Sequence, residues 1–329
     1  MKVLVTGATG YVGHNLAVDL AKKGYDVNIL VRDPNSAFTP HHAKIHVFKG
    51  DITQKESIDA AIRDCEWVFH TAAFARLWAR KTSVFYDINV EGTRHLLDAS
   101  LNNGVQKFCF TSTCGVLGHS VKEPLGENDP RINGFDNDYN LSKFLAEKLV
   151  VEYSKTGLFT VIASLSKVFG PGIETRPVSV NEVIRKFIAG KISFSPSPGS
   201  LLSNYVFIDD SVQGHLFAME KGRSGEKYIL GGENLSYKEF FEILRKVSGK
   251  KGKLFYAPKN VARMYGWMHY GQSRLQGKDP HFSGKDVGHI YCNKSFSCSK
   301  AEKELGYIIT PFTEALEKTV DFLKNQKHG

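Results

Sequence analysis

A glycine-rich turn near the N-terminus constrains the fold more than any other feature of the sequence. Residues 2–6 (KVLVT) form a short run of high β propensity, and residues 11–23 show apolar positions at helical spacing. Between these runs stand three glycines at intervals of three. In a strand–turn–helix context this spacing is typical of a pyrophosphate-binding turn, in which N–H groups of the helix N-terminus face the phosphates. We therefore expect dinucleotide contacts from Gly7, Gly10, Tyr11, Val12 and Gly13; the alternative is an ordinary strand–helix turn.

Strand and helix signals alternate through the first half of the chain. Short apolar runs predict strands at residues 2–6, 27–31, 45–48, 66–70, 107–111 and 160–165. Helical spacing predicts helices between them, at residues 11–23, 53–63, 83–103 and 137–156. This alternation indicates βαβ units, and hence an α/β fold with a doubly wound, parallel Rossmann sheet.

The pattern changes after residue 170, where glycines and prolines become frequent. Strands are expected at residues 204–208 and 226–230, and helices at residues 211–220, 237–247, 261–276, 299–305 and 313–325. We expect two interleaved units. Residues 1–165 plus about 204–232 would form the dinucleotide-binding domain, and about 166–203 plus 233–329 a smaller, mostly helical substrate lobe.

The composition argues against several classes of protein. Of the 329 residues, 42% are hydrophobic and 23% are charged, as in ordinary globular chains. No stretch approaches the roughly 20 apolar residues of a membrane span, and the N-terminus does not resemble a signal peptide, so we expect a cytoplasmic protein without stable membrane insertion. Five cysteines without a CxxC pair, and no HExxH motif, favour free thiols and no metal site. The net charge of +9 is spread along the chain, which suits anionic small molecules better than nucleic acid.

The end of the second predicted strand bears on the choice of dinucleotide. A site selective for NAD places Asp or Glu there, about 20 residues after the glycine turn. This chain has Val31 at that position, followed by Arg32 and Asp33. A guanidinium can bind a 2′-phosphate through two hydrogen bonds, so we favour NADP over NAD. The alternative is that Arg32 pairs with Asp33, which leaves the preference open.

A tyrosine and a lysine one helical turn apart are the strongest candidates for catalysis. Tyr139 and Lys143 lie at i and i+4 near the start of a predicted helix, so both side chains project from one face. A nearby ammonium favours the phenolate and lowers the tyrosine pKa toward neutrality. Ser112 and Thr113 end the fifth predicted strand, at the sheet edge where open α/β sheets bind ligands. Either hydroxyl could bind a substrate oxygen.

Together these motifs resemble the extended short-chain dehydrogenase/reductase family, also called the NAD-dependent epimerase/dehydratase superfamily, over essentially the whole chain. The matching segments occur in the family's order. They are the glycine turn, residues 50–52 (GDI), 70–73 (HTAA), 89–93 (NVEGT), 111–113 (TST), Tyr139 with Lys143, 168–172 (VFGPG) and 205–210 (YVFIDD).

The resemblance implies a role for each matching position. Asp51 and Ile52 would flank the adenine, and Ala72, Ala73, Thr111 and Val168 would lie along the cofactor. Asn89 would join the active-site strand to its helix, although Asp51 and Asn89 could instead cap local turns. Tyr139 would exchange a proton with the substrate, Thr113 would bind its oxygen, and Lys143 would hold the nicotinamide ribose. A homodimer through residues 83–103 and 137–156 is also implied.

Departures from the family pattern indicate which branch the chain resembles. Ser164 and Lys167 replace the arginine and asparagine of the sugar-nucleotide enzymes. The chain looks closer to the dihydroflavonol-reductase-like branch and to farnesol dehydrogenases, and the latter likeness favours NAD. Gly118 replaces the asparagine that flavonoid reductases use, which argues against a flavonoid substrate.

We therefore expect an oxidoreductase that interconverts a carbonyl and an alcohol on a small hydrophobic substrate. Phe74 would face that substrate, and Lys167 would either bind an anionic group on it or be solvated. The apolar and aromatic residues of the helix at 261–276 would belong to the core, and some of them would line a pocket or a lid; the helix could instead contact a membrane. Two alternatives remain: an epimerase or dehydratase that retains NAD, and a non-catalytic cofactor-binding protein.

Overall fold

Seven parallel strands form the central sheet of the computed structural model, which describes residues 1–173, 175, 179–277, 279–280 and 283–326. Their order is β10-β6-β5-β4-β1-β2-β3. The strands are β1 (Lys2–Thr6), β2 (Asp26–Val31), β3 (Ile45–Lys49), β4 (Trp67–His70), β5 (Lys107–Thr113), β6 (Phe159–Leu165) and β10 (Lys227–Leu230). The order runs outward in both directions from β1 and β4, as in a doubly wound Rossmann sheet. The expected fold class is confirmed.

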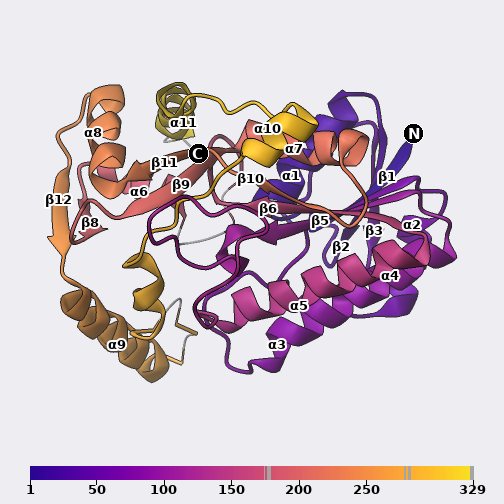
Figure 1. The fold of residues 1–329 in the computed structure, drawn as a ribbon, viewed down its shortest axis with the longest axis horizontal. Coiled ribbons are helices and arrows are strands. Elements are labelled where there is room, and N and C mark those ends of the chain that lie inside the picture. Colours follow the sequence, from indigo (N-terminus) through magenta and orange to yellow (C-terminus); the bar gives the residue numbers. More distant parts are fainter. Residues whose placement is uncertain (174, 176–178, 278, 281–282, 327–329) are drawn as a thin grey trace.

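Helices cover both faces of this sheet, which explains the nearly continuous apolar runs of its strands. One face packs against α1 (Tyr11–Lys22) and α7 (Ile208–Lys221). The other packs against α2 (Asp59–Ile62), α4 (Gly92–Asn102) and α5 (Asp138–Tyr153). In Figure 1 the first layer lies above the sheet and the second below it. The two cores are therefore separated by the sheet itself.

The described residues of the second half of the chain form five further α-helices and two small sheets. The helices are α6 (Val180–Ile188), α8 (Tyr237–Ser248), α9 (Lys259–Leu275), α10 (Ser299–Leu305) and α11 (Phe312–Asn325). One small sheet has the order β11-β9-β7, with β7 (Lys167–Phe169), β9 (Leu202–Phe207) and β11 (Glu233–Ser236). The other pairs β8 (Ile192–Pro196) with β12 (Lys253–Ala257). The strand expected at residues 204–208 thus forms, but outside the central sheet, and the proposed domain boundaries remain a prediction.

Two expected helices differ from the sequence prediction. Residues 53–63 form a 3₁₀ turn at Lys55–Ser57 and the short α2, because Asp51 accepts hydrogen bonds from the N–H and the hydroxyl of Thr53 and holds a tight turn. Residues 83–103 are helical throughout, but α3 (Ser83–Tyr86) and α4 are joined by a π-helical turn at Asp87–Glu91. Such turns often occur at functional sites.

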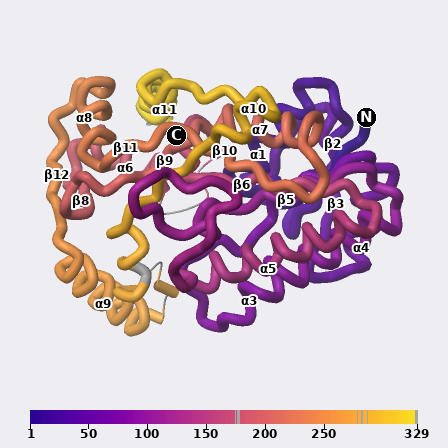
Figure 2. Tube along the Cα trace, in the orientation of Figure 1, coloured from indigo at the N-terminus to yellow at the C-terminus, as the bar shows by residue number. Residues whose placement is uncertain are grey.

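The carboxyl ends of the central strands meet at one edge of the sheet. The glycine turn follows β1, Arg32 follows β2, Ala72 follows β4, and β5 ends at Thr113. This geometry brings together candidate residues that are far apart in the sequence (Figure 2). None of the helices in the described part of the chain is long and apolar enough to span a bilayer.

Candidate active site

The glycine turn makes a close backbone contact that no side chain would permit. Gly7 has φ +77°, and a Cβ atom there would lie 2.5 Å from the backbone nitrogen of Ala72. A Cβ on Gly13 would lie 2.4 Å from the carbonyl oxygen of Gly7. Gly10 precedes α1, and no side chain caps this helix end. The first N–H groups of α1 are therefore available to an anion, as a pyrophosphate requires.

Two other predicted contacts of this turn have partners within the protein. The Tyr11 hydroxyl donates a hydrogen bond of 2.7 Å to the carbonyl of Gly170, so it fastens the turn to the loop after β7. The side chain of Val12 packs against the apolar core. Only the backbone N–H groups of these two residues remain suited to phosphate binding.

The residues expected to lie near the adenosine differ in exposure: Arg32 and Asp33 are exposed, Asp51 is half-buried and Ile52 is buried. Arg32 is exposed after β2, and the described residues offer it no hydrogen bond or ion pair. Asp33, the alternative partner, accepts a hydrogen bond from the Asn35 N–H at 3.0 Å. Asp51 and Ile52 lie in the loop after β3. Asp51 accepts hydrogen bonds from Thr53, in agreement with the alternative that it caps a local turn. Ile52 packs against Gly92. An unpaired guanidinium beside the glycine turn suits a phosphate.

Asn89 links the loop after β4 to helix α5. Its Oδ1 accepts a hydrogen bond of 2.7 Å from the Phe74 N–H, and its Nδ2 donates to the Ser142 hydroxyl at 2.9 Å. The π-helical turn carries this buried side chain. The joining role that the resemblance implied for Asn89 therefore has a geometric basis. Ala72 and Ala73 lie in the same loop, between the glycine turn and Phe74.

The three hydroxyls at the end of β5 point to different surroundings. The Thr111 hydroxyl hydrogen-bonds His215 of α7 at 2.8 Å, so that side chain faces away from α5. Ser112 lies on the α5 face, like Phe110 two residues earlier, and its Oγ is buried without a hydrogen-bond partner among the described residues. The Thr113 Oγ accepts a hydrogen bond from the Gly115 N–H and can still donate. Buried hydroxyls usually have partners, and Ser112 shares this unpartnered state with Ser164, Ser166 and Ser193 among the described residues.

Helix α5 presents Tyr139 and Lys143 one turn apart. The Asn137 side chain caps the helix by accepting from the Asn140 N–H, which places Tyr139 in the first turn. Lys143 is only 1% exposed, and its Nζ lies 3.8 Å from the centroid of the Phe110 ring. Because Phe110 and Ser112 share the α5 face of β5, Lys143 and Ser112 lie on the same side of the central sheet.

Burial dominates the electrostatics of Lys143. Desolvation lowers the pKa of Lys143 to about 7, although the nearby Glu147 carboxylate opposes the shift. His70 adds no charge, because burial and the Lys143 ammonium hold the pKa of His70 well below 6.5. The neutral imidazole instead hydrogen-bonds Thr6 and Thr93 at 2.7 and 2.9 Å. The site therefore contains one buried amine whose charge changes near neutral pH.

The glycine turn at β1 and the Tyr139–Lys143 pair both lie within a segment that matches a known protein family. The model of the "NAD dependent epimerase/dehydratase family" matches residues 3–231. The chain belongs to this family. Its members are nicotinamide-dependent enzymes, and the match confirms the expected family.

Individual relatives of this epimerase/dehydratase chain agree with that assignment. A dihydroflavonol 4-reductase-like protein of Synechocystis is 28% identical over 337 residues, covering 99% of this chain and 94% of its own. A 3-beta-hydroxysteroid dehydrogenase of Mycolicibacterium neoaurum is 28% identical, covering 93% and 86% of the two chains. The crystal structure of UDP-glucose 4-epimerase from Thermotoga maritima has a TM-score of 0.82 at 23% identity, with 99% of both chains covered, and shows the same fold.

Lys167 of this family member belongs to a polar cluster beside the hydroxyls of β5. Its Nζ donates to the Ser203 hydroxyl at 2.7 Å and to the Tyr237 hydroxyl at 3.1 Å. Burial lowers the pKa of Lys167, but the phenols of Tyr237 and Tyr205 raise it by more, so the ammonium keeps its charge. Val168 follows it in β7. The structure therefore does not leave Lys167 solvated.

Sequence reasoning missed the other members of this cluster. The Lys294 ammonium lies 3.7 Å from Asp136, whose other oxygen is 2.8 Å from Nε2 of His119. The hydrogen bond to Asp136 is the main cause that raises the pKa of His119 to about 9. Lys294 and His119 thus share the Asp136 carboxylate, whereas Lys167 is held by the hydroxyls of Ser203 and Tyr237. No motif signals this grouping, because its members come from four distant segments.

Arg131 was also missed, and it holds the loop that follows Thr113. Its Nη1 donates to the carbonyls of Gly115 and Val116 at 2.9 and 2.8 Å, and its Nη2 donates to Gly134 at 2.7 Å. A Cβ on Gly115 would lie 2.4 Å from the Asn140 side chain, so this loop packs closely on α5. Arg131 therefore fixes Thr113 relative to Tyr139 from a distance.

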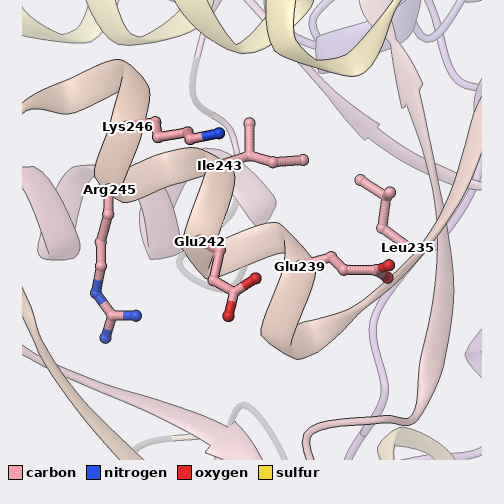
Figure 3. Close-up of a pocket in the computed structure, with 6 residues that line it drawn as sticks. All are labelled: Leu235, Glu239, Glu242, Ile243, Arg245 and Lys246. Atoms are coloured by element: carbon pink, nitrogen blue, oxygen red, sulfur yellow. The ribbon is translucent and has the colours of Figure 1, made fainter.

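Two surface hollows differ in their relation to this site. One, of about 450 Å³, is lined by Leu235 and α8 residues including Glu239 and Arg245 (Figure 3). Helix α8 lies far from α5 in Figure 1, and Glu239 is occupied in capping its own helix, so this hollow is not the candidate site. The other, of about 320 Å³, combines the apolar side chains of Phe74, Trp78, Ala79 and Val84 with the charged side chains of Arg76, Arg80, Lys81 and Asp279. It adjoins the Asn89–Phe74 link, on the substrate side expected from the sequence.

Proposed function

We propose that this family member is an NAD(P)-dependent oxidoreductase that interconverts a carbonyl and an alcohol on a hydrophobic substrate. The observation that carries the proposal is the buried Lys143 beside Phe110, with Tyr139 one turn earlier and the unpartnered Ser112 hydroxyl on the same face. A buried ammonium stabilises a nearby phenolate, and a free buried hydroxyl suits a substrate oxygen.

Each residue has a distinct role in the proposed mechanism. A bound nicotinamide would supply or accept the hydride. Thr113 and Ser112 donate hydrogen bonds to the substrate oxygen and orient it. Tyr139 gives that oxygen a proton during reduction and removes one during oxidation. Lys143 lowers the pKa of Tyr139 and holds the nicotinamide ribose through its ammonium.

We propose NADP as the cofactor because Arg32 is exposed and unpaired among the described residues after β2. The glycine turn and Val31 fit this choice, since neither supplies a carboxylate to bind a ribose 2′-hydroxyl. The remaining predicted contacts, from Asp51 to Val168, stay assigned as the family resemblance implies. The Thr111 contact would have to be made by its backbone, because its hydroxyl is bonded to His215.

The substrate proposal combines an apolar body with an anionic group. Phe74 and Trp78 line the hollow beside the site, and a relative is named 3-beta-hydroxysteroid dehydrogenase, which supports an apolar substrate. Lys167 with Lys294 supplies more positive charge than Asp136 neutralises, which supports a carboxylate or phosphate on that substrate. The sugar of a sugar nucleotide would fit the Phe74 and Trp78 side chains less well than an apolar body.

Replacement of Tyr139 tests the mechanism. One portion of the purified protein is denatured, and any released nicotinamide is identified by mass. A second, folded portion without bound cofactor is titrated with NADPH and NADH. We expect no retained cofactor and tighter binding of NADPH. Tyr139→Phe should lower turnover at least about 100-fold while cofactor affinity stays unchanged, since only the proton donor is lost.

Tyr153→Phe is the matched control, because that tyrosine lies on the same helix and bonds Asp98 of α4. Its turnover should stay near that of the wild type. Normal turnover of Tyr139→Phe would refute the mechanism. Stoichiometric retained NAD would instead favour an epimerase or dehydratase that returns the hydride internally. An empty protein with no turnover on any carbonyl or alcohol would favour the non-catalytic alternative.

A further inference from the structure

Helix α9 turns its apolar side toward solvent. Val261, Met264, Tyr265, Met268 and Leu275 are between 45% and 91% exposed, and their spacing places them on one side of the helix; we call them the α9 stripe. The buried positions Gly266 and Ser273 lie on the opposite side. A helix of a water-soluble domain normally buries its apolar stripe. The described residues therefore leave most of the surface of this stripe exposed.

A second exposed apolar surface precedes α9 in the chain. The β8–β12 ribbon places Phe194 opposite Phe255, with ring centroids 5.9 Å apart, and both side chains are more than half exposed. Ser193 and Ser195, which alternate with Phe194 along β8, are buried. Strand β12 leads directly into α9, and Figure 1 shows the ribbon and α9 along the edge of the molecule farthest from β1, β2 and β3.

The charge around these surfaces is mostly positive. Residues 243–278 contain nine Lys or Arg and no Asp or Glu, and the exposed acids Glu242 and Asp279 flank this segment. Exposed cations belong to both surfaces or their flanks: Lys250, Lys251, Lys253, Lys259, Arg263 and Arg274. An amphipathic helix with apolar, aromatic and methionine residues on one side and an excess of cations is typical of binding to the interface of an anionic membrane.

We propose that the α9 stripe and the β8–β12 ribbon bind the surface of a bilayer that contains anionic lipids. The apolar side chains would enter the acyl boundary, and the surrounding lysines and arginines would meet the lipid headgroups. A second copy of the chain fits this surface less well, because self-association would bring six exposed cations of each copy together. Binding would be peripheral and weakened by salt.

This position would connect the membrane to the candidate site. The Tyr270 ring, on the side of α9 away from the stripe, lies 6.2 Å from the Trp78 ring, which lines the hollow next to Phe74. A lipid-soluble substrate could pass from the bilayer along this hollow toward α5. That last step rests on the proposed function, whereas membrane binding itself does not.

Vesicle co-sedimentation of the full chain tests the proposal. We expect the protein to sediment with vesicles of phosphatidylcholine containing phosphatidylglycerol, and much less with phosphatidylcholine alone or at high salt. Met264→Glu/Met268→Glu should lower the bound fraction about tenfold, because carboxylates would then face the lipid. Circular dichroism and cofactor binding should stay unchanged.

Val121→Glu/Ile308→Glu is the matched control, since these residues are 68% and 76% exposed and lie outside both surfaces. Its vesicle binding should equal that of the wild type. Equal sedimentation with and without anionic vesicles, or equal loss in the control, would overturn the proposal. A dimer that the Met264→Glu/Met268→Glu variant converts to monomer in light scattering would assign the surface to a second copy. Tyr139→Phe should bind vesicles normally, so failure of the enzymatic proposal stays separate.

Discussion

Lys143 is the residue whose environment most directly shapes the chemistry of the site. It is buried against Phe110, and desolvation lowers its pKa to about 7, whereas an unfolded lysine titrates near 10.4. Between these two pH values the unfolded chain holds a proton that the folded chain has released. The free energy of unfolding therefore decreases as the pH falls from about 10 to about 7, and the full loss is present below 7.

Lys143→Met should remove this pH-dependent loss. At neutral pH the free energy of unfolding of the variant should equal that of the wild type or exceed it by up to about a few kcal/mol. This difference should shrink toward pH 10. Turnover should nevertheless be lost. Urea unfolding at neutral and at alkaline pH measures this difference. The burial argument would be contradicted by a variant that is less stable than the wild type at neutral pH and regains stability at high pH.

Lys167 gives a second prediction at the scale of one residue. If it binds an anionic group of the substrate, Lys167→Met should raise KM about tenfold or more and change kcat less, because the lost contact is remote from the reacting atoms. Lys238→Met is the control, since Lys238 is an exposed residue of α8 next to Tyr237. An unchanged KM for every active substrate would exclude this role.

At the scale of elements, the site depends on how two loops are held against α5. Arg131 donates to the carbonyls of Gly115, Val116 and Gly134, and so ties the loop after Thr113 to the loop before Tyr139. Arg131→Ala should lower kcat about 10-fold to 100-fold with little change in cofactor affinity, because Thr113 would lose its fixed position. Arg131→Lys should not restore it, since an ammonium cannot reproduce the planar fork of donors. Steady-state kinetics with cofactor titration separates these effects; rescue by lysine would indicate a role of charge alone.

At the scale of the molecule, the two halves of the chain complete each other's cores. Strand β10 pairs with β6, and α7 covers the face of β5 through the Thr111–His215 hydrogen bond. Residues 1–165 alone would leave the edge of β6 and one face of the sheet uncovered. We expect this fragment to show no cooperative thermal transition and no stabilisation by cofactor, in contrast to the whole chain. A cooperative, cofactor-dependent transition of the fragment, followed by circular dichroism, would show that the domain is independent. The homodimer and the cytoplasmic location remain predictions.

Local sequence patterns were sufficient for the fold class and for the residues nearest the proposed chemistry. The glycine spacing, the strand–helix alternation and the Tyr139–Lys143 pair arise within single elements or adjacent ones, where backbone geometry sets which side chains share a face.

Only the tertiary structure decided the rest, because those features depend on contacts between distant segments. The small sheets pair strands as far apart as β8 and β12, and the Lys167–Lys294 cluster draws on segments from residue 119 to residue 294. The lowered pKa of Lys143 required its burial, which spacing does not reveal. Likewise, the helical period of α9 was visible in the sequence, but which of its faces meets solvent was set by packing at Gly266 and Ser273. Periodicity specifies what lies together on an element, and only long-range packing specifies what that element faces.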